Sequence, residues 1–359
     1  MTEPPTYRIA IFPGDGIGPE VVAEGLKVLD AAEKRFGFQT ERKSFPWSGA
    51  HWLATKELMP DSVLDEVRTF DAVLLGAVGH PGAPPGLVER AVVGGLRWGL
   101  DLYANVRPVR LYHERLTPLK GKLPADIDFI VVRENTEDLY VGLGGFFKKG
   151  TPDEVATGEM IVTRKGTERV IRYAFELARS RPRKKLTLVD KANAVMAHDL
   201  WRRTFREVAL EYPDVATDAL YVDAAAMFMV QAPERFDVMV TTNMFGDILT
   251  DLGAMLQGGM GSAASANIHP GRVSLFEPIH GSAPDIAGTG TANPTATVLA
   301  VGMMLDFLGQ AAAGALIEET VRGVLTDGRL PGLDARTGLS TTEIGDLLAG
   351  EIVGGRPIS

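Results

Sequence analysis

Short runs of β-branched and apolar residues alternate with longer amphipathic segments over most of the chain. Five such runs are bounded by turn or polar residues, as buried strands are, and they cover residues 8–12, 72–75, 129–132, 185–189 and 237–241. Between the first two runs, apolar residues recur every three or four positions from Val22 to Phe36, which predicts a helix. Pro19 and Glu20 suit its first turn. The pattern predicts an α/β fold in which helices cover an inner sheet.

The pattern changes at two later places. Residues 142–158 contain five glycines and show no helical period, which is typical either of a surface loop or of a β-arm that reaches a partner subunit. Residues 258–295 are rich in Gly, Ser, Ala and Pro, and three apolar-periodic helices follow them. We therefore predict one lobe from residues 1–102 and 256–359. A second lobe, residues 103–255, is inserted into it and carries the arm at about residues 142–163.

The composition narrows the class of protein. The 359 residues are 45% hydrophobic and 23% charged, which is typical of a globular protein. Lys and Arg total 37 against 46 Asp and Glu, and this acidic balance argues against a nucleic-acid partner. Cysteine is absent, so disulfides, thiolate nucleophiles and thiolate-bound metals are excluded. With no targeting signal and no apolar stretch long enough to span a membrane, we expect a cytoplasmic protein without a membrane partner.

Three glycines stand in the segment FPGDGIGPE, residues 12–20, between the first strand and the first helix. Their spacing is G-x-G-x-G, whereas the dinucleotide-binding fingerprint is G-x-G-x-x-G. A tight strand-to-helix turn is therefore the favoured interpretation. A role in lining a cofactor cleft is the alternative.

Three arginines, Arg97, Arg107 and Arg133, lie at the ends of predicted elements. Guanidinium groups bind carboxylates through two parallel hydrogen bonds, so these residues are candidates for holding an acidic substrate. Ordinary surface ion pairs are the alternative. Tyr140 follows Arg133 by seven residues, and it is either a packed ring or a hydroxyl with a chemical role.

Acidic residues gather after another predicted strand, in the segment TTNMFGDILTD. Asp247 and Asp251 are four residues apart on a predicted helix and share a face, which is unfavourable unless a cation lies between them. Carboxylate oxygens favour Mg²⁺ or Mn²⁺, while a solvated acidic face is the alternative. Asp223 could add a third carboxylate. Lys191 follows a strand and is either a surface residue or a base.

The irregular segment EPIHGSAPDIAGTGTANP, residues 277–294, is long for a loop, which usually indicates a function. Its many small side chains would let backbone amides approach an anion or a planar ring. Asp285 could accept hydrogen bonds from ribose hydroxyls, as acidic residues do in other NAD sites.

Five segments, taken in order and spacing, resemble one family. They are GDGIGPE, LDLYANVRP, VVRENTEDLY, NMFGDILTD and FEPIHGSAPDIAGTGTANP, and the resemblance runs from about residue 8 to residue 308. The family is that of the isocitrate and 3-isopropylmalate dehydrogenases, the metal-dependent decarboxylating 2-hydroxy-acid dehydrogenases. Among its members the chain is most similar to the 3-isopropylmalate and the tartrate or D-malate enzymes. The resemblance implies a two-lobed α/β fold with a mixed sheet and flanking helices, distinct from the Rossmann fold. The larger lobe would bind the cofactor, and the inserted lobe would form the dimer interface.

The resemblance also implies an NAD-dependent enzyme that needs Mg²⁺ or Mn²⁺ and works as a homodimer. Substrate binding is implied for Arg97, Arg107, Arg133, Val93 and Gly94. Metal binding is implied for Asp247, Asp251 and the neighbouring subunit's copy of Asp223. Acid-base catalysis is implied for Tyr140 and for Lys191, which would also cross from the second subunit. Cofactor binding is implied for Glu277, His280, Gly281, Ser282, Ala283, Asp285 and Asn293, with Asp285 selecting NAD over NADP.

The substrate follows from the helix before Arg97, which in relatives touches the group on C3 of the substrate. Val93 is apolar, which argues against isocitrate. Isopropylmalate enzymes have a leucine at the position of Gly94, and its side chain forms part of the pocket wall. Glycine lacks this side chain, so we expect room for a bulkier group on C3 of the substrate; the alternative is that the helix packs closer to its neighbour. A 3-isopropylmalate-like malate is the first choice. The alternatives are tartrate or D-malate, homoisocitrate or isocitrate, and a noncatalytic regulatory subunit.

Overall fold

The structure, a computed structural model, describes residues 4–334 and 337–354 and separates into two compact units. Within these residues, unit 1 holds the chain up to Leu102, Arg110–Pro124 and the chain from Ala254 onward, and unit 2 holds Tyr103–Val109 and Ala125–Gly253. The sequence analysis placed residues 110–124 in the inserted lobe, whereas the structure groups them with unit 1. Long-range bonds explain the difference, because the Arg115 guanidinium donates to the Leu330 carbonyl oxygen at 2.9 Å.

The strands of unit 1 lie side by side in the order β2 (Gln39–Ser44), β1 (Thr6–Gly14), β3 (Ala72–Ala77), β12 (Ser274–Pro278) and β11 (Ala264–Ile268). The first four run parallel, and β11 is antiparallel to β12. Strands β3 and β12 are buried along their whole length, as strands covered on both faces are.

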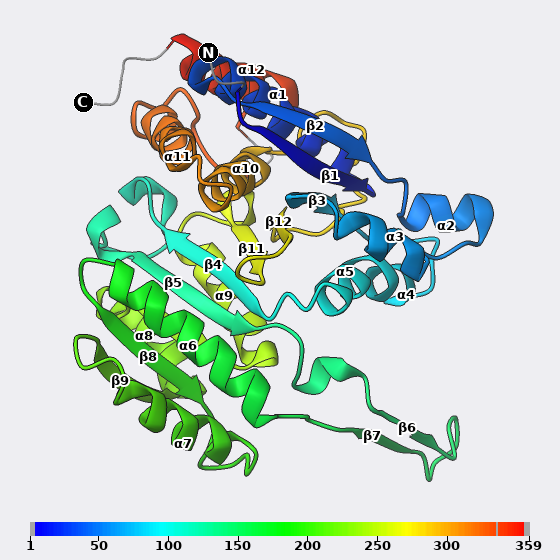
Figure 1. Ribbon diagram of the computed structural model, residues 1–359, viewed down its shortest axis with the longest axis vertical. Helices are drawn as coiled ribbons and strands as arrows, with labels where there is room; N and C mark the ends of the chain where they lie inside the picture. Colours follow the sequence, from blue (N-terminus) through cyan, green and yellow to red (C-terminus); the bar gives the residue numbers. More distant parts are fainter. Residues whose placement is uncertain (1–3, 335–336, 355–359) are drawn as a thin grey trace. The chain divides into compact units, whose positions relative to one another are not determined.

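The helices of unit 1 flank these strands. They are α1 (Gly18–Phe36), α2 (Gly49–Thr55), α3 (Asp61–Val67), α4 (Leu87–Glu89), α5 (Gly95–Gly99), α10 (Thr295–Phe307), α11 (Ala311–Thr326) and α12 (Thr341–Gly354). Helix α12 lies beside α1 (Figure 1), where the Lys27 ammonium meets the Asp346 carboxylate at 2.6 Å. A π-helical turn, Arg90–Gly94, joins α4 to α5, and such turns are frequent at functional sites.

The strands of unit 2 follow the order β4 (Ala104–Arg110), β5 (Asp128–Glu134), β10 (Val238–Thr241), β8 (Lys185–Asp190) and β9 (Ala216–Tyr221). From β5 to β9 each neighbour is parallel. The accompanying helices are α6 (Arg164–Ser180), α7 (His198–Ala209), α8 (Val222–Gln231) and α9 (Asn243–Leu256). Helices α6 and α7 lie side by side (Figure 1) and bury Phe175 and Trp201.

The glycine-rich segment of unit 2 forms a β-hairpin. Strands β6 (Gly144–Phe147) and β7 (Val155–Gly158) pair antiparallel and extend away from the other strands of unit 2 (Figure 1). Both strands are exposed along their whole length. The segment therefore forms a β-arm and not an irregular surface loop, while its contact with a partner subunit stays a prediction.

The predicted elements are confirmed. Four of the five strand segments lie wholly in strands, and the fifth, residues 237–241, lies in β10 except for its first residue. The helix predicted after the first strand lies in α1, and three helices close the described chain. The fold class, mixed α/β with flanking helices, is also confirmed. In the part of the chain that the structure describes, no helix is long and apolar enough to cross a membrane.

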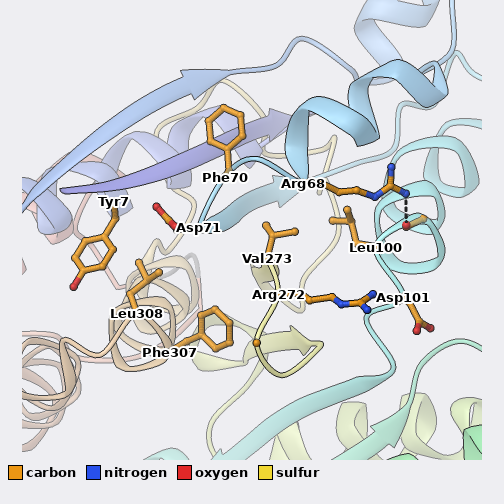
Figure 2. A pocket seen from close by; sticks show the side chains of 12 residues that line it. Tyr7, Arg68, Phe70, Asp71, Leu100, Asp101, Arg272, Val273, Phe307 and Leu308 are labelled. Atoms are coloured by element: carbon orange, nitrogen blue, oxygen red, sulfur yellow. Dashed lines mark hydrogen bonds between the residues drawn. The ribbon is translucent and has the colours of Figure 1, made fainter. Parts of the chain in front are cut away.

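A pocket of about 680 Å³ lies in unit 1 at the amino-terminal ends of the parallel strands. Tyr7 near the start of β1, Asp71 before β3 and Val273 before β12 line it (Figure 2). Its charged side chains are exposed or half-buried, and Arg68 already donates to the Gly99 carbonyl oxygen at 2.8 Å. Ligand sites in parallel sheets lie at the opposite, carboxyl ends of the strands. The candidate site is therefore built from the segments that follow those ends.

Candidate active site

Arg133 is the centre of a hydrogen-bond network in unit 2. Its side chain is 3% exposed and donates to the Asp247 carboxylate on α9. Its Nε and Nη2 atoms donate to Asn243 Oδ1 at 2.9 and 2.7 Å. Gly246 makes this packing possible, because a Cβ there would lie 2.5 Å from Arg133 Cβ and Cγ. The guanidinium is thus held rigidly against the first turns of α9.

Arg107 adds a second buried cation beside the same carboxylate. Its Nη1 atom lies 3.5 Å from Asp247 Oδ1 and donates to Thr250 Oγ1 at 2.6 Å, while its Nε atom donates to Asn105 Oδ1 at 2.7 Å. The side chain of Arg107 is 5% exposed, but that of Asp247 is 37% exposed. Two fixed guanidinium groups therefore flank a carboxylate that solvent reaches, an arrangement suited to recognising a small acid.

Asp251 lies one helical turn beyond Asp247. Burial raises the pKa of its carboxyl group, the Arg107 and Arg133 guanidinium groups lower this pKa, and the Asp247 carboxylate raises it. These influences place both carboxylates and both arginines in one electrostatic cluster. Among the residues that the structure describes, no group of three or more Asp, Glu or His side chains could hold a metal ion. A single chain thus brings together the predicted carboxylate pair, Asp247 and Asp251, but not the third predicted metal ligand, Asp223.

Tyr140 joins the cluster through its hydroxyl, which donates to Asp247 Oδ2 at 2.7 Å. Burial, and then the hydrogen bond and negative charge of Asp247, raise the pKa of the phenol to about 12. The hydroxyl therefore keeps its proton at neutral pH. Tyr140 thus places a protonated hydroxyl beside the Asp247 carboxylate and the Arg133 guanidinium.

Lys191 and Asp223 form a separate pair. The Lys191 ammonium, just after β8, donates to Asp223 Oδ1 at 2.6 Å, and this hydrogen bond lowers the pKa of Asp223. Asp223 lies in the first turn of α8 and is 65% exposed. The predicted metal ligand and the predicted base are thus brought together in one chain, but Asp223 does not join the other two aspartates.

Arg97 belongs to unit 1, and its guanidinium is tied to a buried carboxylate. Its Nη2 atom lies 2.5 Å from Glu277 Oε1, which also accepts from Asn267 Nδ2 at 2.8 Å. Glu277, one of the predicted cofactor residues, is 6% exposed. In this structure Glu277 therefore orients Arg97, a role that the sequence analysis did not foresee.

The loop after β12 carries the other predicted cofactor residues. The ring atom His280 Nε2 is buried and has no hydrogen-bond partner within the described residues, while Gly281 is exposed with open space around it. Asp285 is exposed, and the described chain offers its carboxylate no partner. Ala283 has a positive φ of 41° and packs with its neighbours against Ile17. Within the described residues, the ring nitrogen and the carboxylate without partners, together with the accessible backbone, could contact a dinucleotide.

Two other predicted cofactor residues have structural bonds. The Ser282 carbonyl oxygen accepts from the Ile17 N–H at 2.9 Å, which joins the loop to the glycine-rich turn before α1. A Cβ at Gly16 would lie 1.9 Å from that carbonyl oxygen, so this glycine permits the close approach. Asn293 Oδ1 accepts from the Thr295 N–H at 3.0 Å at the start of α10. The glycine-rich turn therefore acts as a tight turn that supports the loop.

The space over Gly94 is occupied. A Cβ at Gly94 would lie 2.6 Å from Trp98 Cζ3 and 3.1 Å from two further ring atoms. The indole therefore covers the face of the helix that was expected to be open. The Arg90 guanidinium also lies over this ring, 5.6 Å from its centroid. The expectation of empty room is wrong, because a side chain one turn further along the same helix fills it.

We therefore expect Gly94→Leu to destabilise the protein by about 1–3 kcal/mol, because a leucine must displace the Trp98 ring. The double variant Gly94→Leu/Trp98→Ala should recover most of this loss. Gly350→Leu in α12 is the matched control, since nothing lies within 4 Å of a Cβ there; it should be neutral or stabilising by up to about 1 kcal/mol. Urea unfolding of the three variants and the parent measures these differences. A well-folded Gly94→Leu variant of unchanged stability would show that the Trp98 ring moves aside without a cost in stability.

Three further residues, not predicted from the sequence, shape these sites. Asp15 is buried and accepts from the N–H groups of Gly49 and Gly79 at 2.7 and 3.0 Å. Asn243 orients Arg133, and Asp138 contacts the start of α9. All three lie inside the quoted segments or the turns beside them. Only Asp15 carried a local signal, since it stands between Gly14 and Gly16; the roles of Asn243 and Asp138 depend on long-range contacts.

Comparisons with known proteins agree with this geometry. The model of the family described as isocitrate/isopropylmalate dehydrogenase matches residues 8–348. The chain is 53% identical over 349 residues to a 3-isopropylmalate dehydrogenase of Thermobifida fusca, covering 96% of this chain and 97% of that protein. It is also 53% identical over 350 residues to a 3-isopropylmalate dehydrogenase of Frankia casuarinae, covering 97% and 100%. The crystal structure of isocitrate dehydrogenase from Methylococcus capsulatus superposes with a TM-score of 0.87 at 41% identity, covering 97% and 99%. The family expected from the motifs is thus confirmed, and the chain belongs to the isocitrate/isopropylmalate dehydrogenase family.

Proposed function

We propose that the protein catalyses the NAD-dependent and Mg²⁺- or Mn²⁺-dependent oxidative decarboxylation of 3-isopropylmalate, giving a 2-oxo acid and CO₂. The observation that carries this proposal is the cluster of Asp247, Asp251, Arg107, Arg133 and Tyr140 in unit 2. It combines hard oxygen ligands, carboxylate-binding forks and a protonated phenol. The relatives named 3-isopropylmalate dehydrogenase support this choice of substrate.

The residues fit both groups that this reaction needs. Asp247 and Asp251 would hold the divalent cation, completed by Asp223 of a second subunit, because carboxylate oxygens suit Mg²⁺ and Mn²⁺. The loop from His280 to Asn293 would hold the adenosine half of NAD. When bound, NAD supplies a hydride acceptor and the cation supplies a Lewis acid.

The chain's own residues perform the remaining tasks. Arg107 and Arg133 hold the carboxylates of the substrate and so position its C2 and C3 atoms; for Arg97 the same task is implied by the family resemblance. Lys191 of the second subunit takes the proton of the C2 hydroxyl as general base. Tyr140 gives its proton to C3 after CO₂ has left, which agrees with a pKa of about 12 that keeps it protonated until then.

We also propose that the active form is a homodimer. Large apolar side chains are exposed on unit 2, including Phe146 and Phe147 of the arm, at 61% and 65%, and Met227 of α8, at 64%. A two-stranded hairpin is marginally stable alone, and exposed apolar patches are typical of subunit interfaces. A dimer would also bring Asp223 and Lys191 to the carboxylate pair of the partner.

The test of the proposed function is a substrate panel. The purified chain is assayed for NADH formation with 3-isopropylmalate, D-malate, tartrate, isocitrate and homoisocitrate, each with NAD and Mn²⁺. The highest kcat/KM should belong to 3-isopropylmalate, since Val93 offers no polar group for a third carboxylate. A preference for another acid would replace the substrate assignment, and no turnover with any of them would favour a regulatory subunit.

We expect the enzyme to prefer NAD to NADP through Asp285. Its exposed carboxylate can accept hydrogen bonds from the ribose hydroxyls but would repel an added phosphate. Asp285→Asn should therefore improve kcat/KM for NADP relative to NAD by about tenfold. Asp346→Asn, an exposed aspartate on α12, is the control and should leave the ratio unchanged. A parent enzyme that already favours NADP would contradict the cofactor assignment.

A further inference from the structure

Asp138 holds three parts of unit 2 together. Its Oδ1 atom accepts from the Leu139 N–H and its Oδ2 atom from the Met244 N–H, both at 2.8 Å. Its own N–H donates to the Ile161 carbonyl oxygen at 2.8 Å, in an isolated β-bridge at the base of the arm. The residue is 2% exposed. Asp138 thus joins the turn of Tyr140, which is the short helical turn Leu139–Val141, to the start of α9 and to the base of the arm.

The backbone of Asp138 is strained. Its φ of 72° and ψ of −150° lie in a region that almost only glycine occupies. A glycine would adopt this conformation without cost, so what the aspartate adds is its carboxylate. That carboxylate satisfies an N–H of the first turn of α9, which has no partner within the helix.

Both elements that Asp138 joins carry groups of the candidate active site. Tyr140 follows it by two residues, and α9 carries Asp247, which accepts the Tyr140 hydroxyl. A second bond runs parallel to the first, since Asn243 Nδ2 donates to the Glu137 carbonyl oxygen at 3.1 Å. The distance between the phenol and the Asp247 carboxylate therefore depends on the link between the turn and the helix.

We infer that Asp138 is a positioning residue: its carboxylate fixes the turn of Tyr140 to the start of α9, and so places the phenol for proton transfer. This inference rests on the proposed function in one respect, namely that Tyr140 acts as the proton donor. The strained backbone conformation of Asp138 costs free energy that a glycine would not lose. The carboxylate must therefore contribute more to the protein than this strain costs.

The test uses Asp138→Gly, which keeps the backbone conformation and removes the carboxylate, in the parent and in the Tyr140→Phe variant of the full chain. We expect Asp138→Gly to lower kcat with 3-isopropylmalate by about tenfold to a hundredfold, with KM changed much less. In the Tyr140→Phe background the same change should have little further effect, because the group that it misplaces is absent. Asp138→Asn retains one acceptor and should fall between the parent and the glycine variant.

Amide hydrogen exchange at Leu139 and Met244 gives a readout that needs no turnover. Exchange at both should quicken in Asp138→Gly, and Asp138→Asn serves the same purpose if the glycine variant fails to fold. The matched control is Ser340→Gly, which removes another helix cap, the bond from the Glu343 N–H to Ser340 Oγ in α12. It should leave kcat and exchange at Met244 unchanged.

Two results would overturn the inference. The first is unchanged exchange at Met244 with parental kcat in Asp138→Gly. The second is a full, multiplicative loss from Asp138→Gly in the Tyr140→Phe background, which would mean that Asp138 acts other than through the phenol. A parent chain inactive toward 3-isopropylmalate would instead contradict the proposed function, and the exchange measurement would still decide whether Asp138 fixes the turn to α9.

Discussion

Asp251→Asn and Asp247→Asn are each expected to lower kcat/KM by at least about a hundredfold, because either change removes a carboxylate from the proposed cation site. Asp251→Asn is the cleaner variant, since Asp247 also faces two buried guanidinium groups and accepts the Tyr140 hydroxyl. Asp247→Asn leaves those cations without a full counter-charge and should also destabilise the fold. Unfolding by urea separates this loss of stability from the loss of turnover.

Removal of the metal should give the same loss in the parent enzyme, and added Mn²⁺ should restore activity. Binding of Mn²⁺ measured by electron paramagnetic resonance should weaken in both variants. The control is Asp199→Asn, an exposed aspartate of α7 that pairs with Arg203, which should retain both turnover and Mn²⁺ binding. Full activity of a preparation shown to be free of metal would exclude the proposed role of the two aspartates.

The sequence predicted most of the fold because the fold depends on local periodicity. The five strand segments follow short apolar runs, and α1 follows an apolar repeat of three or four residues, both of which the chain carries within short windows. The segment TTNMFGDILTD predicted the carboxylate pair for the same reason, since residues four apart on a helix share a face. Elements and local pairs were therefore predictable.

The partners of the site residues were not predictable, because they are set by packing over long separations. Arg97 and Glu277 are 180 residues apart, and no local pattern joins them. The orientation of a large side chain was equally hidden: the Trp98 ring folds back over Gly94, where the sequence predicted open space. Side chains on a helix point toward its amino terminus, so position 98 covers position 94.

A mixture of two inactive variants should regain activity if Lys191 acts across the dimer interface. In a hybrid of Lys191→Ala and Asp247→Asn subunits, the site that keeps its own Asp247 receives an intact Lys191 from its partner. Random exchange of equal amounts should therefore restore about a quarter of the parental activity. Within one chain Lys191 bonds Asp223 and not the Asp247 cluster, which is what a site shared between subunits would require.

The matched control places both changes in one chain and mixes it with the parent. A hybrid of that double variant with a parental subunit has no working site, because one site lacks Asp247 and the other lacks the partner's Lys191. After subunits have exchanged in an equal mixture, the activity should be about half of that shown by the same amount of parental enzyme alone. If Lys191 serves its own subunit, both results reverse: the two single variants recover nothing, and the double variant leaves the parental sites intact. Differently tagged subunits, recovered together by affinity capture, establish that exchange has occurred before either mixture is assayed.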